Sequence, residues 1–479
     1  MSAWERYAYY YLSLIQSNPG DWQRLEGELE QIRRAWTWVN DINGDAGLIL
    51  AYVWAVRPFL EQRALWREAI AWYQRGLAAA QNQGQTHDVG ALWNNLGAAW
   101  YTLSEWSRAR ECYEQALTIF RQLDDRPCQA RALNGLGLVS QAEGKITGAL
   151  HYYEQALQLF RVEGDSSGEA TVLQNMGRAY ADLEQWDDAI SFYEQALALY
   201  RTQDDQVAIA STLNNLAITC RNKADVVSSA ERDAWYSKAL TYGSRALELF
   251  VQTGHRFHEA VALGNLGELA QCLGQLDKAR LYSEQALEIF REIGAPLQEA
   301  ISLANLGSLY SAIGDFERAL DYNERALTLF EGLGSKVEQA TLLDNIAAIH
   351  QTRYAFDEAL TYRKKALSLW RMLNNKNAEA HTLAAIGEIH LHQREFHLAR
   401  ENLEQARQLF QSLANRKGEA IALNNLALAC QFEGDIVRSR VLYAEALRLA
   451  IQAGDQELAN TVSHNLARLA RETGEERDH

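Results

Sequence analysis

Leu303-Ala304-Asn305-Leu306-Gly307 is one copy of a five-residue unit that returns through almost the whole chain. The Gly or Ala that closes the unit, called the marker below, stands at Gly97, Gly137, Gly177, Ala217, Gly267, Gly307, Ala347, Gly387, Ala427 and Ala467. The markers are 40 residues apart, except for the 50 residues between Ala217 and Gly267. A period of this length is typical of a solenoid, in which each repeat stacks on its neighbours. We therefore expect a solenoid rather than a single globular domain.

The composition of the chain argues against several classes of partner. Its 479 residues include 62 acidic and 46 basic side chains, a formal net charge of −16. A surface this acidic repels phosphate backbones, so we expect no nucleic-acid partner. No apolar run approaches the roughly 20 residues that cross a bilayer, and the N-terminus lacks the pattern of a signal peptide, so we expect no membrane insertion. Five scattered cysteines are typical of reduced thiols, which predicts a cytoplasmic location.

Each repeat is predicted to be a pair of amphipathic helices. In residues 90–129, apolar residues recur at spacings of three and four around Leu96, and again around Ala116. Residues that favour turns follow the first half of a repeat at Ser104, Gly144, Gly274, Gly314 and Gly434. Others follow the second half at Asp124, Gly164, Asp204, Gly254, Gly294, Gly334, Asn374 and Gly454. The residue types at these positions accept left-handed backbone conformations, so we expect a turn after every helix.

Small residues are predicted to let the two helices of a repeat approach closely. Gly97 is followed twelve residues later by Ala109, and the same spacing recurs in most repeats. Aromatic residues such as Tyr113 are expected to fill the space nearby. Because one helical hairpin cannot cover its own apolar face, its stability must come from stacking on its neighbours.

These features resemble the tetratricopeptide repeat in a 40-residue form. The residues that carry the resemblance in one repeat are Trp93, Leu96, Gly97, Trp100, Ala109, Tyr113 and Ala116. The form with Asn before Leu-Gly is similar to kinesin light chain, to Pins-type scaffolds and to the sensor arms of bacterial signal-transduction ATPases. The resemblance implies an all-α fold, a right-handed superhelical solenoid of tandem helical hairpins. It also implies a protein or peptide partner without identifying it.

The period divides the chain into three parts. Residues 1–44 lie outside the register and are expected to form an N-terminal helical cap. About ten hairpins follow over residues 45–455, and residues 456–479 are expected to form a capping helix and a charged tail. Ten extra residues fall within 222–236, between the two helices of one hairpin. They predict either a passive extension at one edge of the solenoid or a loop that folds toward a ligand.

The first 44 residues are predicted to form two helices, Trp4–Ile15 and Trp22–Val39. Pro19 prevents a continuous helix between them. The segment is rich in aromatic residues. They are interpreted either as a cap for the first hairpin or as a docking surface for another chain, since large exposed apolar patches often mark interfaces.

Motifs of known catalytic chemistry are absent from the sequence. The stretch Gly144-Lys145-Ile146-Thr147 lacks the spacing of a phosphate-binding loop, and no HExxH, GxSxG or Gly-rich dinucleotide motif occurs. Histidines gather at His350, His381, His390, His392 and His397. The first and third of these fill a slot that holds an aromatic ring in other repeats, which indicates hairpin packing. We therefore expect no enzyme, no cofactor and no metal ion.

An asparagine stands two residues before eight of the ten markers. These residues are Asn95, Asn175, Asn215, Asn265, Asn305, Asn345, Asn425 and Asn465. Asn is roughly 0.6 kcal/mol worse than Ala as a helix former, so its recurrence needs a reason. A ladder of amides can hold an extended peptide backbone, whose C=O and N–H match the amide's donor and acceptor. In the resembling families, Asn at this position clamps peptide in the concave groove. Alternatively, each amide bonds the adjacent repeat and fixes the stacking.

Three arginines are expected to select the ligand. Arg131 lies four residues before the asparagine slot and Arg178 three residues beyond it, so both share its face. Arg221 lies six residues beyond Asn215 and is less well aligned. Together they predict a basic patch for an acidic peptide or a carboxylate. Later repeats place Glu268, Asp344 and Glu388 on or beside the same face. A groove of two polarities is therefore predicted.

Two functions fit these observations. The first is a non-enzymatic interaction scaffold that binds an extended segment of another protein in its concave groove. The second is a sensory or regulatory module that binds a small molecule or a signalling peptide for a separate effector chain. The sequence gives no information on oligomeric state or on the identity of the partner.

Overall fold

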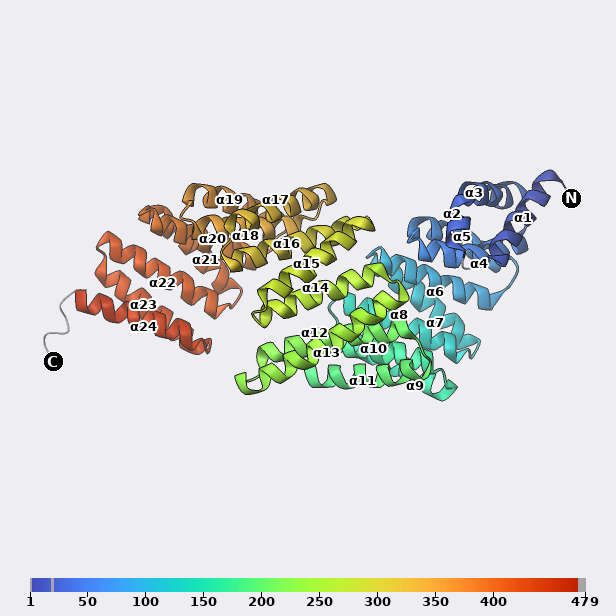
Figure 1. Ribbon diagram of the computed structural model, residues 1–479, viewed down its shortest axis with the longest axis horizontal. Helices are drawn as coiled ribbons and strands as arrows, with labels where there is room; N and C mark the ends of the chain where they lie inside the picture. The colour runs from blue at the N-terminus through green and yellow to red at the C-terminus, as the bar shows by residue number, and fades with distance from the viewer. Residues whose placement is uncertain (1, 19–20, 473–479) are drawn as a thin grey trace. The chain divides into compact units, whose positions relative to one another are not determined.

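The computed structural model describes residues 2–18 and 21–472, and every regular element within them is helical (Figure 1). Since these residues include no strand, the predicted all-α class is confirmed. The chain divides into two compact units, the first ending at Gly254 and the second beginning at His255. Pro19 and the charged tail 473–479 lie outside the described residues. No helix in the described ranges combines the length and the apolar character that crossing a membrane requires.

The elements of the first unit are α1 Ala3–Ser17, α2 Trp22–Gly27, α3 Leu29–Thr37, the π-helical turn η1 Trp38–Asn43, α4 Ala46–Gln62, α5 Trp66–Asn82, α6 Thr86–Thr102, α7 Trp106–Gln122, α8 Arg126–Ala142, α9 Ile146–Glu163, α10 Ser166–Asp182, α11 Trp186–Thr202, α12 Gln206–Val226 and α13 Ser229–Thr253. Those of the second unit are α14 Arg256–Cys272, α15 Leu276–Glu292, α16 Pro296–Ile313, α17 Phe316–Leu333, α18 Lys336–Thr352, α19 Phe356–Met372, α20 Lys376–His392, α21 Phe396–Ser412, α22 Arg416–Glu433, α23 Ile436–Gln452 and α24 Gln456–Glu472.

Consecutive helices from α4 onward pair into hairpins, α4 with α5, α6 with α7, and so on to α22 with α23 (Figure 1). Each hairpin packs on the next one within its unit, and α24 packs on α23 and α22. The predicted architecture of tandem helical hairpins is therefore confirmed in both units.

The turns between helices adopt the left-handed conformation that the sequence predicts. After α6, Ser104 has φ 60°, and its N–H donates to the carbonyl of Tyr101 at 2.9 Å. The N–H of Glu105 donates to the carbonyl of Trp100 at 3.0 Å, which completes a Schellman motif. The same conformation occurs at residues that do not favour it, namely Ala64, Glu184, Tyr354, Arg394 and Ala414. The packing of the helices on both sides overrides local preference there.

Small residues at the markers allow close contact within a hairpin, as predicted. A Cβ atom added to Gly137 on α8 would lie 2.3 Å from Cε1 of Tyr153 on α9. One added to Gly177 would lie 2.8 Å from Cδ1 of Tyr193. Both tyrosines are buried, so their rings have little room to move away. The marker therefore keeps the two helices at a distance that a larger residue would increase.

The ten extra residues lengthen two helices instead of forming a loop. The hairpin α12/α13 has helices of 21 and 25 residues, whereas α10 and α11 have 17 each. The ammonium groups of Lys223 and Lys238 lie 4.0 and 4.1 Å from the ring centroid of Trp235. The hydroxyl of Tyr236 donates to Asp225, which ties the two extensions together. The insertion is thus an ordered helical extension.

The N-terminal segment differs from the predicted pair of helices. The first helix is present as α1, but the second is divided into α2, α3 and η1. Glu28 leaves helical geometry between α2 and α3, next to Gly27, which is about 1 kcal/mol worse than Ala in a helix. Trp36 of α3 stacks on Trp72 of α5 with ring centroids 4.1 Å apart. The segment therefore covers the first hairpin.

Three aromatic residues of α1 remain partly exposed. The hydroxyl of Tyr52 on α4 donates to the carbonyl of Ala8, which holds α1 against the first hairpin. Trp4, Tyr9 and Tyr10 are nonetheless 50%, 46% and 60% exposed. Helix α1 is thus packed as a cap, and three of its aromatic rings stay partly exposed at different positions around the helix.

The first helices of successive hairpins form one face of each unit, called the first-helix face below. In the first unit α6 contacts α8, α8 contacts α10 and α10 contacts α12. In the second unit α16 contacts α18 and α20 contacts α22. Second helices make fewer contacts with one another, so the stack is tighter on the first-helix face. This face carries the asparagine slots.

Candidate functional site

Some asparagine slots form hydrogen bonds between neighbouring hairpins. Nδ2 of Asn175 on α10 donates to Oδ1 of Asn134 on α8 at 2.9 Å. Nδ2 of Asn465 on α24 donates in the same way to Oδ1 of Asn424 on α22 at 3.0 Å. In both pairs, the slot two residues before one marker meets the position three residues before the preceding marker. These amides fix the stacking of the hairpins.

Other asparagine slots differ in their surroundings. Oδ1 of Asn425 accepts from the neighbouring Asn424 at 3.1 Å. Asn345 is exposed, whereas Asn215 and Asn265 are half-buried. The ladder is therefore not uniform, and its members must be considered one by one.

Asn95 lines a cavity of about 360 Å³ on the first-helix face of α4, α6 and α8. The wall also includes Trp54, Arg57, Asn94, Cys128 and Arg131. Nδ2 of Asn95, Oδ1 of Asn94 and Nε of Arg57 are buried, and none of the three has a hydrogen-bond partner among the described residues. Leaving a buried polar group unpaired costs about 1–3 kcal/mol. Beside the cavity, two donors and one acceptor thus lack a hydrogen-bond partner among the described residues.

A second cavity of about 440 Å³ adjoins the first and shares Asn94 and Arg131 with it. It extends along α8 to the start of α10, where Ser167 and Thr171 line it. The asparagine slot of α8 is occupied by Gly135. A Cβ atom there would lie 2.4 Å from Cε1 of Tyr113, so the ring excludes a side chain at this slot. The break in the ladder has a steric cause.

The three predicted arginines lie in different surroundings. Nη1 of Arg131 lies 3.8 Å from Sγ of Cys128, and the side chain is exposed at the two cavities. Nη2 of Arg178 donates to Oε1 of Gln141 at 3.5 Å, near the C-terminal end of α8. Arg131 lies near the N-terminal end of α8, whereas Gln141, the partner of Arg178, lies about 15 Å further along the same helix. The two arginines are therefore at different ends of α8. Arg221 donates to Asn222 on its own helix at 3.3 Å. Of the three, Arg131 is the one that lines the two cavities.

Acidic side chains of the second unit form bonds between helices. Asp344 of α18 accepts from Nη1 of Arg363 on α19 at 2.7 Å and from the hydroxyl of Thr382 on α20 at 3.1 Å. Glu268 of α14 accepts from Nδ2 of Asn305 on α16 at 3.2 Å. These carboxylates stabilise the stack, so their charge is not simply presented to a ligand.

The two histidines that stand in the aromatic slot, His350 and His390, are explained by packing. The ring of His350 stacks on Tyr362 at 5.4 Å, as Tyr310 stacks on Tyr322 at 5.3 Å in the preceding hairpin. Burial lowers the pKa of His350, which favours the neutral ring in this stack. Nδ1 of His390 lies 2.6 Å from a carboxylate oxygen of Glu395. These rings therefore take the place of aromatic residues in the hairpin.

Sequence reasoning selected Asn95 and Arg131 but missed Arg57 and Asn94. A polar residue three residues before the marker recurs at Asn94, Asn134, Gln174, Asn214 and Asn424. This signal was sufficient to identify Asn94. Arg57 stands at the position where the other repeats have a small marker residue, so the repeat pattern gave no reason to select it. In the structure, this substitution places a guanidinium group beside the cavity.

Models of the tetratricopeptide repeat match more than half of the chain. One such model matches residues 128–202, 170–225, 236–292, 259–332 and 338–412, and another matches residues 93–123. No match was found among curated proteins.

Solved structures with similar folds include sensor proteins. A signal transduction ATPase with numerous domains and a tetratricopeptide repeat sensor, from Pyrococcus horikoshii, has a TM-score of 0.51 at 15% identity, over 87% of this chain and 55% of that chain. The apo form of the quorum sensor NprR from B. thuringiensis has a TM-score of 0.50 at 14% identity, over 76% of this chain and 98% of that one. BtubC (BKLC) from P. vanneervenii has 23% identity and a TM-score of 0.39, over 48% of this chain and 90% of that one. At these identities the likeness concerns the fold alone.

Proposed function

The chain belongs to the tetratricopeptide repeat family, and on this premise we propose that its first unit binds an extended segment of a partner protein or a peptide. The binding site is the pair of adjoining cavities on the first-helix face, called the first-unit groove below. Its polar wall includes Arg57, Asn94, Asn95, Arg131, Asn134, Asp165, Ser167 and Thr171.

The observation that carries the proposal is the set of unpaired polar atoms in the groove wall. Two donors, on Asn95 and Arg57, and one acceptor, on Asn94, are buried without a hydrogen-bond partner in the described part of the chain. A peptide backbone offers a C=O and an N–H at each residue, which complement such a set. Binding that turns these side chains toward the groove would therefore replace unsatisfied groups by hydrogen bonds, each worth about 1 kcal/mol net.

The dimensions of the groove suit an extended segment. Cavities of about 360 and 440 Å³ fall within the usual range of ligand sites. The groove crosses the first helices α4, α6, α8 and α10, and neighbouring packed helices are roughly 9 Å apart. The three steps span roughly 27 Å, which an extended chain covers with about eight residues.

Charge indicates which segment is preferred. Two arginines, Arg57 and Arg131, and one carboxylate, Asp165, line the groove of a chain whose net charge is −16. A guanidinium group forms paired hydrogen bonds with a carboxylate, which makes arginine suited to acidic side chains. We therefore favour an acidic peptide over a neutral one.

The one cysteine of the groove is not an activated nucleophile. This residue, Cys128, has a pKa raised to about 11 by burial and by the hydrogen bond and charge of Asp125, with Arg131 opposing the shift. The thiol therefore stays protonated near pH 7 and is a poor nucleophile. We also propose that the protein is cytoplasmic, because its scattered cysteines would stay reduced there.

Capture of partners from a native lysate tests the groove. The partner segment is first mapped with the unaltered protein, and its affinity is then measured by fluorescence anisotropy. We expect Asn95→Ala to weaken binding about 5- to 30-fold, the equivalent of roughly 1–2 kcal/mol for a lost buried hydrogen bond. Arg131→Glu should weaken it further for an acidic segment.

Two variants serve as matched controls for this measurement. Asn345→Ala alters the same slot in the second unit at an exposed position, and Arg178→Glu reverses a charge that lies near the other end of α8. Both should bind the segment as the unaltered protein does. Equal affinity for Asn95→Ala, Arg131→Glu and the two controls would show that the first-unit groove is not the binding site.

A sensory role is the second candidate, because each cavity also has the volume of a small-molecule site. A thermal-shift screen of metabolites and short peptides distinguishes this role from a scaffold. A ligand at 100 times its Kd adds about 2.7 kcal/mol of stability. A stabilising small molecule whose effect Asn95→Ala removes would favour the sensor, and stabilisation by the mapped partner segment alone would favour the scaffold.

A further inference from the structure

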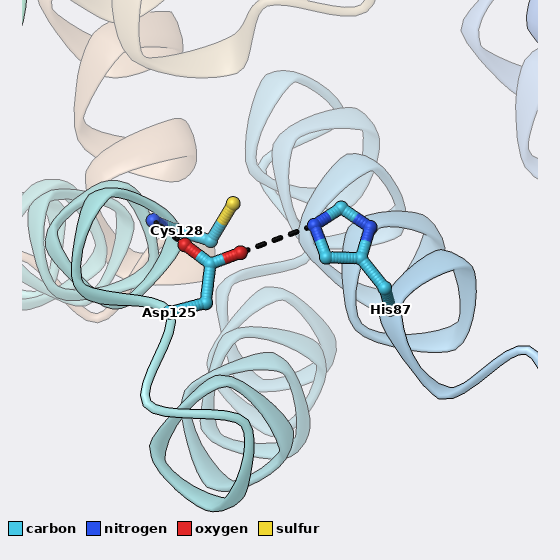
Figure 2. A group of neighbouring side chains, drawn as sticks. All are labelled: His87, Asp125 and Cys128. Carbon is cyan, nitrogen blue, oxygen red and sulfur yellow. Dashed lines mark hydrogen bonds and ion pairs between the residues drawn. The ribbon is translucent and has the colours of Figure 1, made fainter.

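Three side chains of different chemistry converge at the edge of the first unit. His87 lies on α6, Asp125 immediately precedes α8, and Cys128 lies in the first turn of α8 (Figure 2). One nitrogen, one oxygen and one sulfur atom from the three residues all lie within 4.8 Å of one another. In the described part of the chain this is the one group of three such residues that comes together in this way.

The carboxylate at the centre of the group is held in place. Oδ1 of Asp125 accepts the backbone N–H of Cys128 at 3.0 Å, which caps α8. Oδ2 lies 3.1 Å from Nε2 of His87 (Figure 2). The oxygen that faces His87 is thus distinct from the one that caps the helix. Asp125 can give Oδ2 to another partner without loss of the cap.

The atoms and spacings suit a borderline divalent cation. Zn²⁺ binds histidine nitrogen, aspartate oxygen and cysteine sulfur at about 2.0–2.3 Å in a tetrahedron, which places its ligand atoms roughly 3.3–3.6 Å apart. The pair His87–Asp125 is already near this spacing. The His87 side chain is 62% exposed, so its ring has room to adjust. A thiolate beside an imidazole favours zinc over magnesium or calcium, which prefer oxygen ligands.

We propose that His87, Asp125 and Cys128 form a Zn²⁺ site with three protein ligands and a fourth position open to water or to another ligand. Zinc binding replaces the proton of the Cys128 thiol, so the bound residue is a thiolate. The ion joins α6 to α8, two first helices of successive hairpins. Because Cys128 also lines the first-unit groove, the ion sits at the wall of that groove. The site does not depend on peptide binding.

Titration of the full chain, without a histidine tag and under reducing conditions, tests the site with Co²⁺ and Zn²⁺ alone. We expect one Co²⁺ per chain, a thiolate-to-cobalt absorption band in the near ultraviolet, and displacement of Co²⁺ by Zn²⁺. Cys128→Ser should remove the band. His87→Ala and Asp125→Asn should weaken binding by more than about tenfold, since even the loss of a hydrogen bond to a ligand costs 10- to 100-fold.

The chain offers a matched control for each effect. Asp125→Asn keeps the helix cap, because Asn caps helices as well as Asp, so its effect reports on the ligand charge. Cys272→Ser removes an exposed cysteine outside the group and should change nothing. Circular dichroism and melting of each metal-free variant check that it is folded. Absence of saturable binding, or a thiolate band that survives in Cys128→Ser, would overturn the proposal.

Discussion

At the scale of the residue, the turn position after a helix keeps the same backbone conformation from repeat to repeat, although its residue type changes. Positions that follow a helix have positive φ whether they hold Gly144 (φ 77°), Asp124 (φ 51°) or Glu184 (φ 57°). A residue with a Cβ atom pays roughly 1–2 kcal/mol for this conformation, whereas glycine adopts it without strain. The solenoid therefore contains several turns whose stability a single substitution can raise.

Glu184→Gly should stabilise the protein by about 0.5–1 kcal/mol, since relief of the left-handed strain exceeds the extra chain entropy of glycine. Glu184 is exposed in the turn between α10 and α11. Gly144→Ala, at the equivalent turn after α8, should destabilise by a similar amount. The midpoint of urea denaturation measures both. Shifts of the same sign for the two variants would contradict this account of the turns.

Only part of the candidate site could be predicted from the positions of single residues in the repeat. The 40-residue period was enough to place Asn95 and Arg131 on the first-helix face. It did not show that Asn175 bonds Asn134 whereas Asn95 has no partner, because this depends on the side chain that each neighbouring hairpin presents. His87 and Cys128 come together only through the stacking of α6 on α8, so no local spacing indicated the group.

At the scale of the element, the sequence predicted most helices and turns because periodicity and small residues act locally. The predictions failed where helices were interrupted or extended. The helix predicted at Trp22–Val39 is divided at Glu28, and the insertion in 222–236 lengthens α12 and α13. Both outcomes depend on packing, because Trp36 stacks on Trp72 and the ring of Trp235 contacts two lysines. Such contacts are not encoded in a repeat pattern.

Two glycines of neighbouring helices give a matched test of close packing. Gly137→Ala should destabilise by about 1–3 kcal/mol, because the new Cβ atom would lie 2.3 Å from the buried ring of Tyr153. Gly148→Ala on α9 should stabilise by about 1 kcal/mol, because nothing lies within 4 Å of its Cβ position and Ala is the better helix former. Thermal melting followed by circular dichroism measures both. Equal changes in melting temperature for the two variants would mean that helix propensity, rather than contact with Tyr153, determines the effect of a substitution at the marker.

At the scale of the whole molecule, each hairpin depends on its immediate neighbours. In the first unit, for example, α6 packs on α7 and α8. Hairpins further along the chain affect the stability of α6 only through the interfaces that lie between them. The stability of such a chain is approximately a sum of hairpin and interface terms, and its response to a ligand is correspondingly local. The division at Gly254 makes the second unit an internal reference for events in the first.

Hydrogen exchange with the mapped partner segment should therefore show protection that is confined to part of the chain. We expect slower exchange in α4, α6, α8 and α10, whose side chains line the first-unit groove, because a ligand that bridges them lowers the population of locally opened states. Helices α16, α18 and α20 should exchange at the same rate with and without the segment. Protection of these second-unit helices equal to that of α6 and α8 would contradict both the location of the groove and the local response. Asn95→Ala, at a segment concentration that saturates the unaltered protein, should lose the protection of α6 first.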